Sequence, residues 1–475
     1  MWSQAFPRTT ADSVPFKQPA YMRLHSDHFS LPTYEGRARH FELIFSYPTP
    51  VYIAFNYLVF KLFGFSLFTS LGADLVVHFL LVSLVTWLFW RLTGNSWLSA
   101  LAVLALAHLF NPLGRPEELG ILFFVGALAS VALDKPRYWL TVLMLGLCGA
   151  TTPGAAVAAT IQVLSYVALV TGLTRIFWIR AVAIGGLAVL VSLACELIFI
   201  WPYASEAIEQ FRHLSSINPW FSLRQVLRSE PLWGSLVVLS SLGALASAGY
   251  LLVARPEWLP LDSRIGRLVL VLALGIPISL FFNIYLGRPS YDYRISTFEC
   301  LAVIWLTFSQ WLARAPVRRT WLAVAGTLSL LVLAALPSRD YARYFLASAL
   351  AEPGGVSYPQ AVETIRQVVP STATIGGDTA VWAAVDDGRP FYAVRWVGLE
   401  HWPEYVVTTQ WTKVPYVLQE PEWREMIEKS YDEVTPHRDD EAEACACHLL
   451  GIKLPIATGR CDWALRIWKR RTAEQ

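Results

Sequence analysis

The stretch NPLGRPEELG, residues 111–120, holds one cation and two carboxylates between two strongly apolar segments. Arg115 could bind an anion such as a phosphate, and Glu117 or Glu118 could take a proton from a hydroxyl group. A short loop between two membrane helices needs no charge. The stretch therefore indicates either a topology signal or part of a site for group transfer to a hydroxyl.

Other ionisable residues lie in or beside apolar segments, where charge is unfavourable and is usually kept for function. Asp74 and His78 stand four apart, on one face of a predicted helix. The segment GRPSYDYR adds Arg side chains that could hold a phosphate and Tyr rings that could contact a sugar, although both residue types are ordinary at membrane edges. The candidates from this segment are Arg288, Tyr291, Asp292, Tyr293 and Arg294.

The composition predicts an integral membrane protein. Hydrophobic residues make up 55% of the 475 residues and charged residues 16%, with a mean hydropathy of +0.43, which is outside the range of soluble domains. The net charge is +2 and no basic block stands out, which argues against nucleic-acid binding. The sequence has no Gly-rich phosphate loop and no metal-site spacing of His or Cys, so we expect no cofactor and no resident metal.

Apolar segments predict about ten transmembrane helices. Several are shorter than the roughly 20 residues that a perpendicular span needs, so the two segments within 138–172 could form one hairpin, broken around residues 151–154. The predicted spans are 71–90, 96–111, 117–133, 138–150, 154–172, 181–201, 233–254, 268–286, 295–313 and 320–336.

The orientation follows from Lys and Arg, which are enriched in the loops on one side of the predicted membrane; the positive-inside rule assigns that side to the cytoplasm. We then expect residues 112–116, 202–232 and 287–294 and the C-terminal tail to lie outside, in a multi-pass protein of the cell (plasma or inner) membrane. Ionisable residues within spans gather in the outer halves. We expect them to line a cavity open to the outer leaflet, the simpler alternative being that charges collect near helix ends.

Residues 338–475 regain charges, Pro and Gly and predict a C-terminal extracytoplasmic α/β domain, with a helix in VETIRQVVP and strands in TATIGGD and EYVVTT. On the outer face a disulfide could join two of the residues Cys445, Cys447 and Cys461.

Residues 49–68 predict a juxtamembrane interfacial helix, and 69–337 form the predicted transmembrane domain. Residues 1–48 lack an apolar segment of spanning length, so they would lie outside as an extracytoplasmic N-terminal segment whose preceding span is truncated. Alternatively, residues 49–68 cross the membrane and leave residues 1–48 in the cytoplasm.

The order of these features resembles the membrane-embedded glycosyltransferases of the GT-C superfamily, such as protein O-mannosyltransferases and aminoarabinose transferases of the bacterial type. SYPTPVYIAFNYLVFKLFG is similar to their Pro-led juxtamembrane helix, RPEELGILFF to the Arg-then-acid opening of a later span, LGLCGATTPGA to their helix break, and GRPSYDYRI to their aromatic segment. The resemblance covers most of residues 40–340 as a pattern.

The resemblance implies a polyprenyl-phosphate sugar donor, a lipid, glycan or protein hydroxyl as acceptor, and an acidic base in the first outer loop. Asp27 or Glu35 would supply that base, with Asp27 preferred, and a second acidic position maps onto Glu117 or Glu118. The usual Asp-Glu pair of that loop is not intact in this chain.

Two other classes share the membrane signal. A transporter or lipid flippase without glycosyl transfer would also keep polar groups in the membrane, but such proteins often show two related halves, and the sequence has no internal repeat. A non-catalytic scaffold that presents its outer domain to partners would tolerate replacement of Asp27, Glu117 and Arg288.

Overall fold

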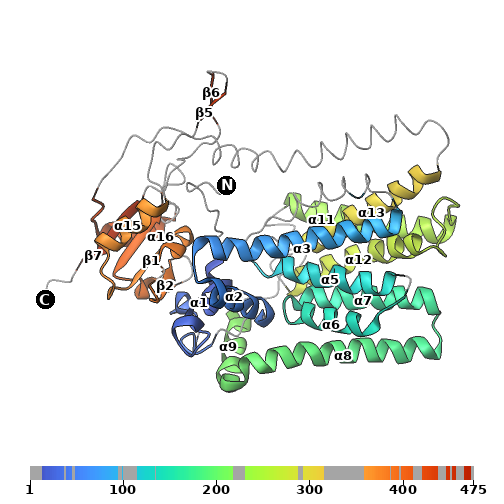
Figure 1. Cartoon of the computed structure of the whole chain (residues 1–475), viewed down its shortest axis with the longest axis horizontal. Coiled ribbons are helices and arrows are strands. Elements are labelled where there is room, and N and C mark those ends of the chain that lie inside the picture. The colour runs from blue at the N-terminus through green and yellow to red at the C-terminus, as the bar shows by residue number, and fades with distance from the viewer. Residues whose placement is uncertain are drawn as a thin grey trace.

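The computed structural model is elongated, with a helical bundle at one end and an α/β region at the other (Figure 1). It describes residues 13–36, 39–44, 49–94, 99, 115–133, 135–217, 231–286, 293–314, 358–385, 387–394, 397–409, 420–436, 446–449, 452–455 and 465–471.

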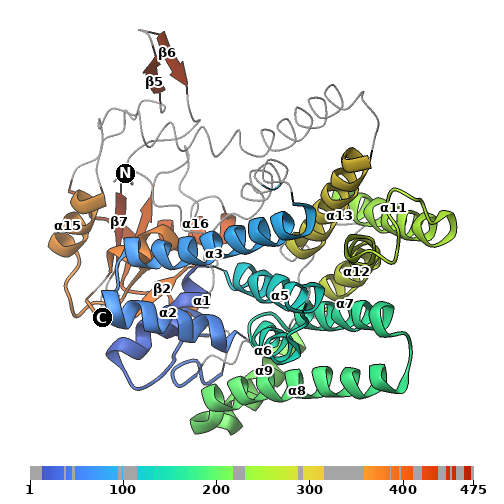
Figure 2. The same cartoon turned by 45° about the vertical axis from the view of Figure 1, so that its right-hand side comes forward.

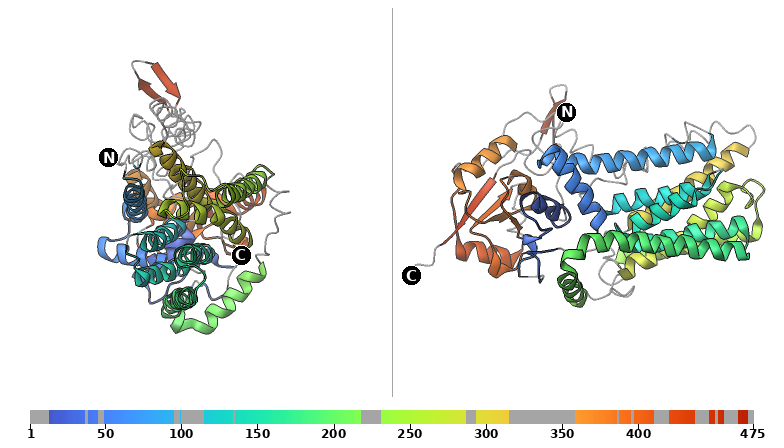
Figure 3. Two further views of the ribbon diagram at one scale, coloured as in Figure 1. Left: turned by 90° about the vertical axis from the view of Figure 1, so that its right-hand side faces the viewer. Right: turned by 60° about the horizontal axis from the view of Figure 1, so that its bottom comes forward.

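The bundle consists of long apolar helices that run roughly side by side, as the end-on view in Figure 3 shows. Every predicted span except 96–111 and 320–336, which lie almost wholly outside the described residues, falls on one of these helices. They are α3 (Leu67–Thr93), α5 (Glu117–Ala132), α6 (Tyr138–Gly149), α7 (Pro153–Thr171), α8 (Arg175–Ile200), α11 (Pro231–Ala254), α12 (Arg264–Leu286) and α13 (Tyr293–Arg314).

Four helical stretches in the described ranges are long and apolar enough to cross a membrane: Leu67–Thr93, Pro153–Thr171, Arg175–Gln210 and Arg264–Phe281. These stretches differ in burial. In the α12 stretch 67% of the most apolar segment of 18 residues is buried inside the protein, whereas in the α8 stretch the share is 11%. An exposed apolar face of this size on α8 suits contact with lipid. Membrane association is supported at this level, and the count of about ten spans stays a prediction.

The predicted helix break is confirmed: α6 ends at Gly149 and α7 begins at Pro153. The break lies against the start of α5, since a Cβ atom on Gly120 would lie 2.3 Å from the Oγ1 atom of Thr152. Only glycine allows α5 and the break to approach this closely. The first turn of α5, with its two glutamates, is held in place by this contact.

The α/β region is built on a five-stranded sheet of order β2-β1-β3-β7-β4, in which β1 is parallel to β2 and β3, and β7 is antiparallel to β3 and β4. The strands and helices predicted in TATIGGD, EYVVTT and VETIRQVVP are confirmed. The elements are α15 (Tyr358–Val368), β1 (Ile375–Gly377), η3 (Thr379–Ala384), β2 (Phe391–Ala393), η4 (Leu399–His401), β3 (Tyr405–Thr409), α16 (Pro421–Ser430), β4 (Tyr431–Glu433), a separate hairpin of β5 (Ala446–Leu449) and β6 (Ile452–Pro455), and β7 (Leu465–Arg470).

The N-terminal residues join the two ends of the molecule. Helix α1 (Ser13–His25) and the 3-10 helix η1 (Pro32–Tyr34) pack against the sheet, and α2 (Pro50–Phe63) lies beside α1 (Figure 2). Gln18 Nε2 donates to Phe391 O at 2.6 Å, and Ala393 N donates to Thr33 Oγ1 at 2.6 Å. The described part of the predicted 1–48 segment therefore shares a core with the C-terminal region.

The length of α2 bears on its position. Its 14 residues rise about 1.5 Å each, or roughly 21 Å, which is short of the roughly 30 Å hydrocarbon core. The chain then passes through Gly64 and enters α3. A helix of this length fits the interfacial placement predicted for residues 49–68 better than a crossing.

Candidate functional site

Five of the ten acidic and basic candidates gather where α1 and α2 meet the first half of α3 and the start of α5, at the end of the bundle that faces the sheet (Figure 1). The aromatic and apolar side chains Phe16, Tyr52, Val77 and Leu119 pack together around them. We call this group the interface cluster; it comprises Lys17, Tyr52, Ser70, Asp74, His78, Arg115, Glu117 and Glu118.

A buried ion pair joins α1 to α3. Lys17 Nζ lies 2.6 Å from Asp74 Oδ2, with the two side chains 1% and 4% exposed. The same ammonium donates to Ser70 O at 2.7 Å and to Ser70 Oγ at 3.1 Å. The hydroxyl of Tyr52 donates to Asp74 Oδ1 at 2.9 Å, so both carboxylate oxygens have a donor. The negative charge of Asp74 is therefore compensated by Lys17, and this carboxylate is disfavoured as a base.

The pKa values of Lys17 and Tyr52, the two groups that contact Asp74, reflect the burial of this site. Burial lowers the pKa of Lys17, and the attraction of Asp74 opposes that effect. Burial also raises the pKa of Tyr52 well above its usual value, and the negative charge of Asp74 adds to the rise. Tyr52 thus stays a neutral hydrogen-bond donor, and it lies near enough to Glu117 for that carboxylate to contribute to the same shift.

The charges at the start of α5 form a second pair of contacts. Arg115 lies 2.9 Å from Glu117 through its Nη2 and Oε1 atoms, and its guanidinium sits 5.7 Å from the ring centre of Phe16. Glu118 Oε1 lies 3.4 Å from His78 Nδ1. Both glutamates are in the first turn of α5, where the partial positive charge of the helix N-terminus favours carboxylates.

Glu117 differs from the other carboxylates of the cluster in one respect. Its Oε1 contacts Arg115, but its Oε2 is buried and has no hydrogen-bond partner in the described part of the chain. A buried acceptor without a donor costs about 1–3 kcal/mol. Glu117 Oε2 is thus an oxygen of the cluster with free capacity to accept a proton or a hydroxyl donor.

When His78 is neutral, the cluster carries a net charge of −1. Lys17 and Arg115 supply two positive charges, and the three carboxylates supply three negative charges. Protonation of His78, or of one carboxylate, brings the sum to zero.

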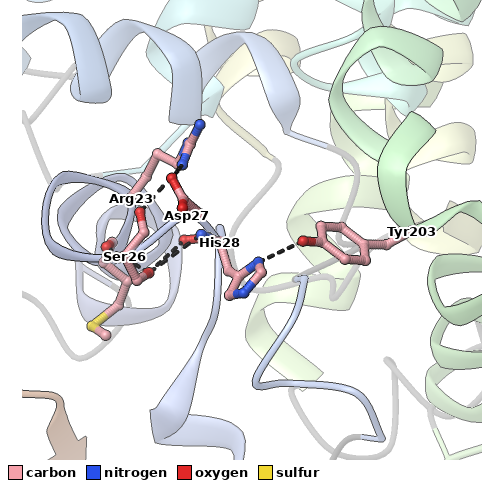
Figure 4. A network of polar contacts seen from close by, with 6 residues as sticks. Arg23, Ser26, Asp27, His28 and Tyr203 are labelled. Atoms are coloured by element: carbon pink, nitrogen blue, oxygen red, sulfur yellow. Dashed lines mark hydrogen bonds and ion pairs between the residues drawn. The ribbon is translucent and has the colours of Figure 1, made fainter.

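Asp27 stands on the loop after α1, beside Arg23 and His28 (Figure 4). Its side chain is 97% exposed and pairs with Arg23 at 3.0 Å. Beside it His28 Nδ1 lies 2.6 Å from the hydroxyl of Tyr203, on η2 (Trp201–Tyr203), just before α9 (Ala204–Ile217). Asp27 therefore has the surroundings of a solvated loop residue. Its neighbour His28, through the contact with Tyr203, connects the end of α1 with the residues that follow α8.

Glu35 contacts the α/β region. Its Oε1 lies 3.4 Å from His401 Nδ1, and its backbone oxygen accepts from Gly398 N at 2.8 Å. Burial, together with the charge of Glu35 and a hydrogen bond to it, raises the pKa of Tyr392 to about 12. The partners of Glu35 are thus residues of the sheet domain, and none of them belongs to the interface cluster.

Several predicted site residues lie outside the described residues, namely Arg288, Tyr291 and Asp292, as do Cys445 and Cys461. Tyr293 and Arg294 begin α13, and Cys447 is on β5, but the structure describes their backbone only. Within the described ranges, no group of three or more His, Cys, Asp or Glu is placed to hold a metal ion.

No protein-family model, curated protein or solved structure matches the chain. The structure brings together Asp74, His78, Arg115, Glu117 and Glu118, which the sequence singled out. It also adds three residues that the sequence did not indicate, Lys17, Tyr52 and Ser70. A carboxylate at position 74 of an apolar helix needs partners, and this need is the signal in the sequence that could have pointed to Lys17 and Tyr52.

Proposed function

We propose that the protein is an integral-membrane glycosyltransferase that moves a sugar from a polyprenyl-phosphate donor to a lipid, glycan or protein hydroxyl on the outer face. The observation that carries the proposal is Glu117, a buried carboxylate with one oxygen on Arg115 and the other without a partner among the described residues. A base beside a cation suits attack by a hydroxyl on a sugar whose leaving group is a phosphate. The GT-C resemblance of the sequence points to the same chemistry.

In the proposed reaction Glu117 Oε2 takes the proton of the acceptor hydroxyl as its oxygen attacks the anomeric carbon. The bond between that carbon and the phosphate oxygen breaks, and the phosphate leaves with the electron pair. Arg115 is the nearest described cation to offset that charge, and Arg288 and Arg294 are further candidates from the sequence. Lys17, Tyr52 and Asp74 act as positioning residues that hold α1, α2 and α3 around the base.

The orientation of the proposal is supported by the distribution of basic residues in the bundle. The end of the bundle far from the sheet carries Arg137, Arg175 and Arg264, which precede or begin α6, α8 and α12. There Arg180 donates to the hydroxyl of Tyr138 at 3.1 Å. By the positive-inside rule this end is cytoplasmic, so the interface cluster and the sheet lie at the outer surface.

The experiment is sugar transfer in membranes that contain the full-length chain, with radiolabelled polyprenyl-phosphate sugars as donors. We expect Glu117→Gln to lower the transfer rate by at least about 10²-fold, because a general base contributes about 10²–10⁴-fold. Glu363→Gln, an exposed carboxylate on α15, is the matched control and keeps full activity.

The variants Asp27→Asn and Glu35→Gln decide between two assignments of the base. Loss of activity in Asp27→Asn with full activity in Glu117→Gln would assign the base to the first outer loop, as the resemblance implies, and would refute the role of Glu117. Full transfer in all of Asp27→Asn, Glu35→Gln, Glu117→Gln and Glu118→Gln would refute the mechanism.

A further inference from the structure

A second polar group lies inside the bundle, where α7, α12 and α13 meet, and it takes no part in the proposed glycosyl transfer. Glu299 on α13 is 0% exposed. Its Oε1 accepts hydrogen bonds from Ser279 Oγ at 2.6 Å and from Gln162 Nε2 at 2.5 Å. Ser279 and Gln162 are each 1% exposed. The contacts to this carboxyl within the described residues come from neutral donors.

The backbone of α12 makes room for the pair. A Cβ atom on Gly275 would lie 2.4 Å from both Cδ and Nε2 of Gln162, so the side-chain amide rests directly on the helix backbone at this glycine. Close by, the ring of Phe124 of α5 stands edge-on to that of Phe298, the residue before Glu299. The amide group of Gln162 faces the carboxyl with its Nε2 atom, the orientation that an ionised carboxylate would also require.

Two atoms of this site have no hydrogen-bond partner in the described ranges. They are Glu299 Oε2 and Gln162 Oε1, both buried and both acceptors when the carboxyl is ionised. An ionised carboxylate without a cation is strongly disfavoured in such surroundings, and each bare acceptor adds its own cost. One proton on Oε2 would remove the charge and would make Oε2 a hydrogen-bond donor.

We propose that Glu299 binds a proton and that the neutral carboxylic acid pairs with the Gln162 amide through two antiparallel hydrogen bonds. The observed bond from Nε2 to Oε1 is one of them, and a bond from the Oε2 hydroxyl to Gln162 Oε1 is the other. The proton comes from water, and the only covalent bond formed is O–H. The site is a proton-binding site that fastens α13 to α7 and α12.

Within the described residues, the polar contacts to this carboxyl come from uncharged groups on the neighbouring helices. On α13 the adjacent titratable group is Cys300, whose side chain packs with Ala244 of α11 and Ile276 of α12. The polar groups contributed by α7 and α12 are the amide and the hydroxyl already named. Loss of the proton would therefore leave a negative charge facing an amide oxygen, and the three helices would separate more easily.

Infrared difference spectroscopy of the full-length chain in detergent micelles tests the proposal. At neutral pH the wild-type minus Glu299→Gln spectrum is expected to show the carbonyl stretch of a protonated carboxylic acid, shifted in D₂O. The control spectrum, wild type minus Glu363→Gln, is expected to show an ionised carboxylate, because Glu363 is on the surface. Gln162→Leu should move the acid band to higher frequency, because the carboxyl loses its amide partner.

An ionised carboxylate band in the wild-type minus Glu299→Gln spectrum at neutral pH would overturn the proposal. If that band depended on added Na⁺, the site would hold a cation in place of the proton. Thermal melting gives an independent readout. Between about pH 7 and 9, below the range in which Tyr392 titrates, the melting temperature of Glu299→Gln, which can form an amide–amide pair, should fall less with rising pH than that of the wild type. Equal pH dependence in the two proteins would also refute the proton site.

Discussion

The ion pair between Lys17 and Asp74 gives the sharpest test of how α1 is held on the bundle. Replacing Lys17 with Met keeps the side-chain volume but leaves Asp74, 4% exposed, with Tyr52 and Ser70 as its neutral neighbours. Removing one partner of a buried pair costs about 3–5 kcal/mol. Since about 1.4 kcal/mol is a factor of ten, the opening equilibrium of α1 should rise by roughly 10²- to 4 × 10³-fold.

Hydrogen exchange of the α1 amides, followed by mass spectrometry in micelles, measures this opening equilibrium directly. The matched control is Arg23→Met, which breaks the exposed pair with Asp27 on the same helix, where the partners are 32% and 97% exposed. Exposed pairs contribute at most about 1 kcal/mol, so exchange should change less than about five-fold.

A double-mutant cycle separates the pair from its surroundings. Lys17→Met combined with Asp74→Leu removes both charges, and its exchange should lie much closer to the wild type than that of either single variant, because no uncompensated charge stays buried. Additive effects of the two replacements, or equal exchange in Lys17→Met and Arg23→Met, would refute the claim that a desolvated charge pair holds α1.

Three further predictions concern other parts of the molecule. Gly120→Ala should destabilise the bundle by about 1–3 kcal/mol through overpacking against the Oγ1 atom of Thr152, and Thr152→Ala should restore the melting temperature of the double variant; failure of the rescue would show that the close contact is not the cause. Burial raises the pKa of Tyr392 to about 12, so between pH 10 and 12 the unfolded chain loses a proton that the folded domain keeps, and stability should fall with rising pH. That slope, read from urea unfolding at several pH values, should be smaller in Tyr392→Phe. In right-side-out membrane vesicles a cysteine at position 432 should react with an impermeant maleimide and one at position 137 should not; the reverse labelling would place the sheet in the cytoplasm and refute the proposed orientation.

The helices of the bundle could be predicted from sequence because hydropathy reports directly on burial in lipid. The break between α6 and α7 was also readable, since Pro153 cannot continue the preceding helix and the residues before it are small. The ends were less accurate: α8 begins at Arg175, six residues before the predicted start at 181, because an Arg at a helix end can extend to the membrane surface.

The position of the N-terminal residues could not be predicted in this way. Lys17 and Gln18 stand in a polar stretch that reads as solvent-exposed, yet they are 1% and 0% exposed because the sheet and α3 cover them from opposite sides. Their partners, Asp74 and the oxygen of Phe391, are 57 and 373 residues away in the chain. Burial of this kind is set by tertiary contacts and leaves no periodic signal.

The buried carboxylates Asp74, Glu117 and Glu299 differ in whether both of their oxygens have a partner, and this difference separates a structural carboxylate from the two with proposed roles in binding a proton. Asp74 has a cation on one oxygen and a hydroxyl donor on the other, so proton uptake would break existing bonds. Glu117 and Glu299 each keep one oxygen without a donor in the described part of the chain. Glu117 has Arg115 beside it and lies at the bundle end, and this contact is why the base is proposed there. The partners of Glu299 among the described residues are the neutral side chains of Ser279 and Gln162, and this is why a proton is proposed there. The two proposed roles thus differ by one neighbouring guanidinium.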